Sequence, residues 1–176
     1  MNPEAGYGWG PGNQSPRNRA TRKKGQQTWS AYLAYDPKEE RLSWRYEQRT
    51  NQWLTAIFVA ERLRQHAQRG HTHLVLVWDQ ASWHVARDLM SWVRHHNRQV
   101  DRQGHGCKLV PVTLPVHAFW LNPVEAFIGH AKGRVLPCRQ FASEQDQKTA
   151  LDRHWLHRNL LHAHVPEPVR INAVLH

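Results

Sequence analysis

The stretch from His73 to His84 constrains this chain most, because it joins a wholly apolar run to a carboxylate. Leu74 to Val77 are all apolar and half of them are β-branched, which is typical of a strand buried on both faces of a sheet. Asp79 follows, and a helical pattern begins at about His84. Open α/β sheets place their chemistry at the carboxyl ends of parallel strands, which makes Asp79 a candidate catalytic acid. Alternatively, Asp79 only starts a turn or caps the next helix.

The charge balance indicates a polyanionic partner. The 176 residues carry a formal net charge of +10 with neutral histidine, and the pI is near 10.3. Nucleic acid is the usual partner of such a chain, and a basic surface without a special role is the alternative. Two cysteines, Cys107 and Cys138, form no disulfide framework or metal motif, which suits a reducing compartment. No apolar run approaches the ~20 residues of a membrane span.

The hydrophobic pattern predicts one α/β domain over 28–164, between an irregular basic lead-in (1–27) and a loose tail (165–176). In chain order we expect a strand at 29–35, a strand at 41–46, a helix at 51–69, a strand at 73–79, a helix at 84–99, an edge strand at 108–112, a helix from 123 and a helix at 143–162.

The first predicted helix has signals at both ends. Thr50 is expected to cap it and Gly70 to end it. Trp53, Ile57 and Leu63 follow helical spacing, so we expect them to face the core.

A second carboxylate opens a later helix. Asn122 is expected to cap this helix and Pro123 to take its first position, which puts Glu125 in the first turn. Two carboxylates brought together at a sheet edge, Asp79 and Glu125, would hold Mg²⁺ or Mn²⁺ through hard oxygen ligands. Glu125 alone would instead be an acid that complements the helix dipole.

The two acidic segments form a known pair of motifs. Asp79-Gln80-Ala81-Ser82-Trp83-His84 comes first, and Leu114-Pro115 leads into Leu121-Asn122-Pro123-Val124-Glu125. Together they resemble the DDE-superfamily endonuclease domain of bacterial insertion-sequence transposases, relatives of the mariner-like elements. That family shows Asp-Asn-x-x-x-His after a buried strand, then Leu-Pro and Leu-Asn-Pro-x-Glu. The resemblance covers about residues 25–160 and implies a ribonuclease-H-like mixed sheet flanked by helices.

The resemblance assigns roles by position. Asp79 becomes the second catalytic acid and Glu125 the third, and both would be ligands of a two-metal site for Mg²⁺ or Mn²⁺. The supporting residues would be Gln80, which replaces the usual Asn, then His84, Asn122 and Pro123. Lys132 and Arg134 would contact DNA, with an ordinary solvated helix face as the alternative.

One departure from the family limits what the chain is expected to do alone. The first catalytic Asp of the family lies on a central strand before the hairpin, and residues 1–28 contain no Asp. We therefore expect a partial catalytic domain that is inactive alone, with the first strand supplied by an upstream frame product. A non-catalytic nucleic-acid-binding remnant is the alternative. The resemblance further implies DNA as partner, a bacterial cytoplasmic, nucleoid-associated location and no membrane, and it leaves a homodimer open.

A histidine group near the carboxyl end offers a weaker alternative, a zinc site. Its members are His154, His157, His162 and His164. Their spacing matches no established zinc pattern, and the polar face of the last helix explains them as well.

Overall fold

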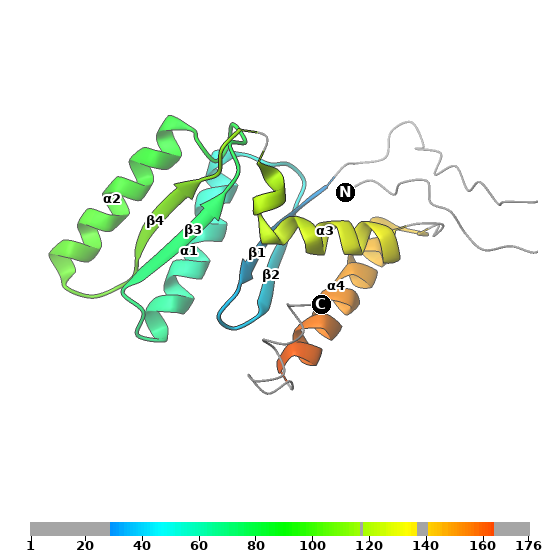
Figure 1. Cartoon of the computed structure of the whole chain (residues 1–176). Helices are drawn as coiled ribbons and strands as arrows, with labels where there is room; N and C mark the ends of the chain where they lie inside the picture. Colours follow the sequence, from blue (N-terminus) through cyan, green and yellow to red (C-terminus); the bar gives the residue numbers. More distant parts are fainter. Residues whose placement is uncertain (1–28, 117, 137–140, 164–176) are drawn as a thin grey trace, which may run out of the picture. The chain divides into compact units, whose positions relative to one another are not determined.

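The computed structural model describes residues 29–116, 118–136 and 141–163 (Figure 1). Its elements, in order, are β1 (Ser30–Asp36), β2 (Arg41–Glu47), α1 (Gln52–Gln68), β3 (His73–Trp78), α2 (Arg87–Gln103), β4 (Lys108–Thr113), a 3₁₀ turn η1 (Phe119–Leu121), α3 (Pro123–Arg134) and α4 (Glu144–Ala163). The predicted α/β class is confirmed. β1 pairs with β2, and β3 pairs with β4, in two separate two-stranded sheets.

The described residues fall into two compact units. The sheet unit contains 29–32 and Arg45–Glu125, and the hairpin unit contains Leu33–Trp44 and the described residues from Ala126 onward.

The sheet unit is built on the parallel pair β3 and β4, which runs in register from His73 opposite Lys108 to Trp78 opposite Thr113. α1 and α2 lie alongside this pair (Figure 1). Buried apolar side chains from all four elements form one core cluster: Ala56, Val59, Leu63, Trp78, Leu89, Val93, Cys107 and Leu109. The helices therefore bury one set of strand side chains.

The other set of strand side chains is exposed. Val75 is 60% exposed and Val77 41%, and Val110 and Val112 on β4 are exposed to a similar degree. The prediction that this strand is buried on both faces is therefore wrong. An apolar run indicates that at least one face of a strand is buried. The elements that pack on the strand determine whether the second face is buried too.

The start of α1 differs from the prediction by one residue. Asn51, not Thr50, caps the helix, because its side-chain oxygen accepts hydrogen bonds from the backbone N–H groups of Trp53 and Leu54. Trp53 is 55% exposed and Ile57 46%, so the expectation that both face the core is also wrong. The helix instead buries a face that includes Ala56, Val59 and Leu63.

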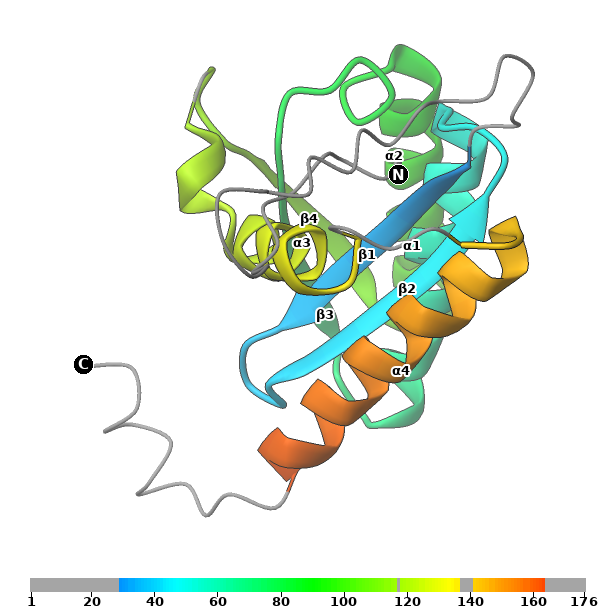
Figure 2. The ribbon, with the colours of Figure 1, turned by 90° about the vertical axis from the view of Figure 1, so that its right-hand side faces the viewer.

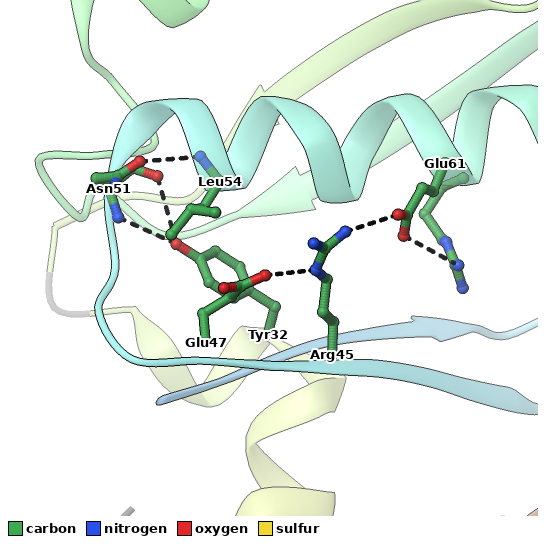
Figure 3. A network of polar contacts seen from close by, with 7 residues as sticks. Tyr32, Arg45, Glu47, Asn51, Leu54 and Glu61 are labelled. Carbon is green, nitrogen blue, oxygen red and sulfur yellow. Dashed lines mark hydrogen bonds and ion pairs between the residues drawn. The ribbon is translucent and has the colours of Figure 1, made fainter. Parts of the chain in front are cut away.

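Polar contacts join α1 to the strands of the same unit (Figure 3). The backbone N–H of Asn51 donates to the Tyr32 hydroxyl at 3.0 Å. The Arg45 guanidinium contacts Glu47 at 2.5 Å and Glu61, on α1, at 2.7 Å. One arginine therefore connects β2 to the middle of α1.

α2 begins three residues later than expected. The segment before it forms a turn, in which the N–H of His84 donates to the carbonyl of Ala81 at 2.8 Å. The helix then runs from Arg87 to Gln103, and Gly104 caps its end in the left-handed conformation with φ of 68°. The side chain of Asn97 fixes α2 to β4, because it donates to Leu109 O at 2.8 Å and accepts from Leu109 N at 2.9 Å.

In the hairpin unit, α4 runs along β2 (Figure 2). The Asn159 side chain accepts from Leu42 N and donates to Leu42 O, each at 2.8 Å. The indole N–H of Trp44 donates to Asp152 at 2.7 Å. Ser143 caps the helix by accepting from the N–H of Asp146 at 3.1 Å. The predicted hairpin and last helix are thus confirmed.

No helix among the described residues has both the length and the apolar character needed to cross a membrane.

Candidate active site

Asp79 follows the carboxyl end of β3, next to the end of its parallel neighbour β4. Its Oδ1 accepts a hydrogen bond from the backbone N–H of Ala81 at 3.0 Å, which makes a local turn of the kind that Asp favours. The side chain stays 44% exposed. Asp79 therefore starts a turn, which was one of the two predicted roles. Its carboxylate is also exposed at the carboxyl end of the parallel strands, where a catalytic acid was the other predicted role.

His84 holds that carboxylate. Its Nδ1 lies 2.7 Å from Asp79 Oδ1. An ionised carboxylate only accepts, so Nδ1 carries the proton in this pair. The imidazole also stacks on Trp78, with ring centroids 5.2 Å apart and planes inclined by 8°. Two independent contacts thus fix the ring, and the ring fixes one oxygen of Asp79.

Sequence reasoning missed the part that Trp78 plays. Trp78 was not among the predicted site residues, although an aromatic side chain just before an Asp-x-x-x-x-His segment is a usable signal. Trp78 is 5% exposed and belongs to the core cluster. The stack therefore connects the position of His84 to the packed interior.

Gln80 links the two sequence motifs. Its side-chain nitrogen donates to the carbonyl of Leu114 at 3.0 Å. The N–H of Leu114 in turn donates to the carbonyl of Trp78 at 2.9 Å. The segment that follows β4 is thereby tied to the segment that carries Asp79. Leu114 was quoted as part of the second motif, but its backbone role was not foreseen.

Glu125 lies in the first turn of α3, as predicted. The backbone N–H of Glu125 donates to the carbonyl of Asn122 at 3.0 Å. The Asn122 side chain receives a long contact of 3.4 Å from the N–H of Val124, and Pro123 is the first helical residue. The helix start is therefore set mainly by the backbone turn and the proline, with a weak contribution from the Asn122 side chain.

The two basic candidates lie in the last turn of α3. Lys132 comes about two helical turns after Glu125, which puts both on one side of the helix. Arg134 is exposed and near enough to His154 of α4 to help lower its pKa.

The donor set suits a hard divalent cation. The contacts of Asp79 within the described residues both use Oδ1, and Glu125 is half-buried in a first helical turn. Carboxylate oxygens are the ligands that Mg²⁺ and Mn²⁺ prefer. No three His, Cys, Asp or Glu side chains converge as a metal group in the described part of the chain. By their chemistry, Asp79 and Glu125 are therefore candidate ligands for such an ion.

The chain matches a known protein family. The model of the family described as DDE superfamily endonuclease matches residues 2–148. Comparison with curated proteins and with solved structures found no match.

Proposed function

Because this chain belongs to the DDE superfamily endonuclease family, we propose that it is the catalytic part of a transposase, which cuts DNA phosphodiester bonds and transfers the cut strand. The observation that supports this most is Asp79, exposed at the end of a parallel strand and held by His84 at 2.7 Å. Such an acid is oriented and still accessible to a ligand.

In this proposal Asp79 and Glu125 hold Mg²⁺ or Mn²⁺. The ions would activate a water or a 3′-hydroxyl and stabilise the leaving oxygen. His84 orients Asp79 through one carboxylate oxygen, which leaves the other oxygen for the ion. Asn122 and Pro123 set the helix start that carries Glu125. Lys132 and Arg134 contribute positive charge for DNA phosphates.

We further propose that the 176 residues do not cleave DNA alone, since they supply the second and third acids but no match for the first. The β3 strand supports this. Among the described residues it pairs with β4 alone, and its Val75 and Val77 side chains are exposed. Since no other described strand pairs with β3, an additional strand that ends in Asp would pair with its second edge beside Asp79. In this proposal an upstream frame product supplies that strand.

A nicking assay tests the proposal. Supercoiled DNA carrying the repeats that flank the gene is incubated with Mn²⁺ and the chain, with and without the upstream product. We expect cleavage only when the upstream product is present. The Asp79→Asn and Glu125→Gln variants should lose that cleavage. His95→Asn, an exposed position on α2, is the matched control.

The other outcomes separate the alternatives. Strong cleavage by the chain alone, abolished by Asp79→Asn, would support the site and overturn the claim of incompleteness. Cleavage that tolerates both acid substitutions would overturn the site. Salt-sensitive DNA binding without cleavage in either mixture would favour the non-catalytic remnant, which the net charge of +10 also suits.

A further inference from the structure

Two histidines from different helices of the hairpin unit face each other. His130 Nδ1, on α3, lies 3.3 Å from His154 Nε2, on α4. The ring centroids are 5.2 Å apart and the planes are inclined by 31°. Two imidazoles meeting head-on at that nitrogen separation would have centroids about 5.6 Å apart, given ordinary ring dimensions. The observed centroid distance is shorter, so the two rings are inclined to each other and are not arranged head-on.

This inclination suits a shared metal ion. Two nitrogens bound to one tetrahedral ion at about 2.0–2.1 Å lie about 3.3 Å apart. We propose that His130 and His154 form a two-histidine chelate for a transition-metal ion of the zinc, copper or nickel class, which joins α3 to α4. Imidazole suits these ions. The site differs in place and chemistry from the carboxylates Asp79 and Glu125, which suit hard cations.

A second histidine pair provides an internal comparison. His66 Nδ1 lies 3.1 Å from His71 Nδ1, with centroids 5.3 Å apart. Two rings meeting head-on at that nitrogen separation would have centroids about 5.4 Å apart, close to the observed distance. Both pairs have a nitrogen separation that allows an N–H···N hydrogen bond. The His130–His154 pair departs further from the head-on arrangement than the His66–His71 pair does, and its two distances match those of a shared tetrahedral ion.

The surroundings of His154 favour its neutral form. Burial, together with His130, Arg134 and His157, lowers the pKa of His154. A neutral imidazole is the form that binds metal, whereas the positive charge of Arg134 opposes a bound cation.

His157 lies one turn further along α4. No third side chain already converges on the pair among the described residues, so water would complete the coordination. The zinc group suggested by the sequence, His154, His157, His162 and His164, shares only His154 with this pair, whose other member is His130 of α3. The side chains of His162 and His164 lie outside the described residues.

The test uses metal binding alone and is independent of DNA cleavage. The full chain, without a histidine tag and treated with chelator, is titrated with Zn²⁺ by calorimetry and with Cu²⁺ by electron paramagnetic resonance. We expect one metal ion per chain to bind more tightly than any other. Bound Cu²⁺ at that site should show nitrogen hyperfine coupling from two imidazoles. His130 is exposed, so His130→Asn should fold, and it should weaken binding at that site at least about tenfold because the second arm of the chelate is lost.

His95→Asn and His71→Asn are the matched controls, one exposed histidine on α2 and one member of the hydrogen-bonded pair. Both should leave the tightest affinity within about twofold of the parent chain. The proposal is overturned if His130→Asn binds like the parent, or if His71→Asn removes the tightest site.

Discussion

His84 Nδ1 lies 2.7 Å from Asp79 Oδ1 while its ring stacks on Trp78. Three residues within one short segment thus form a chain of contacts from the core cluster to an exposed carboxylate. A catalytic acid is useful only when its oxygens are held in a fixed direction. The stack on Trp78 supplies that direction without engaging the second oxygen of Asp79.

Removal of His84 should weaken metal binding at Asp79. Partners that orient a ligand typically contribute 10–100-fold to metal affinity, so we expect His84→Ala to weaken Mn²⁺ binding about tenfold. The measurement is the free Mn²⁺ signal in electron paramagnetic resonance. Asp79→Asn should abolish the same binding, and His95→Ala should leave it unchanged. Equal affinity in His84→Ala and the parent would show that His84 does not orient the acid.

Gln80 offers a test of the link between the two motifs. Loss of its hydrogen bond to the Leu114 carbonyl should lower the free energy of unfolding by about 1 kcal/mol in Gln80→Ala. Urea denaturation measures this as a lower midpoint. Gln103→Ala, exposed at the end of α2, is the matched control and should shift the midpoint much less. A Gln80→Ala midpoint no lower than the control's would contradict the role.

Local signals in the sequence predicted the starts of several helices. They did not predict which helix faces are buried, because tertiary packing determines that. Asn122-Pro123 and Ser143 correctly placed the starts of α3 and α4, because a cap and a proline act within one turn. Trp53 and Ile57 have helical spacing and are still exposed. Which side of α1 is buried depends on the strands and helix packed against it, and no window of sequence contains that information.

In the candidate site, too, local motifs could be predicted from the sequence and long-range contacts could not. Asp79 and Glu125 were predicted as site residues because each belongs to a recognisable short motif. The Gln80–Leu114 bond spans 34 positions and the His130–His154 pair spans 24. Contacts of that range depend on strand register and helix packing, so the sequence alone gave no sign of them.

Asn97 should be important for the stability of the sheet unit. Its side chain makes two hydrogen bonds to the backbone of Leu109, and Asn97→Ala would leave both partly buried backbone groups without a partner. We expect a loss of about 2 kcal/mol in the free energy of unfolding. Asn97→Asp keeps the acceptor for Leu109 N and should lose less at neutral pH. Equal midpoints for the two variants in urea would argue against a bidentate contact.

Cys107 should be an unreactive thiol in the folded chain. It is 2% exposed, and burial raises its pKa, so the reactive thiolate is scarce at neutral pH. In a Cys138→Ser background, a chromogenic disulfide reagent should label Cys107 slowly until urea unfolds the protein. The folded state holds the thiol proton more tightly than the unfolded state, so this group reduces stability as pH rises above about 9. Immediate labelling without denaturant would show that the sheet unit opens readily.

Arg158 provides the last test, on the hairpin unit. Its guanidinium lies over the rings of Tyr35, at 5.0 Å, and Phe127, at 4.2 Å, and donates to the carbonyl of Glu40 at 2.6 Å. A planar cation makes these contacts together, whereas the ammonium of lysine is compact and cannot stack. Arg158→Lys should therefore lower the free energy of unfolding by about 1–2 kcal/mol. The matched control is Arg153→Lys, at an exposed position of the same helix, which should change it by less than about 0.5 kcal/mol. If the two variants unfold at the same urea concentration, the charge of Arg158 matters and its planar shape does not.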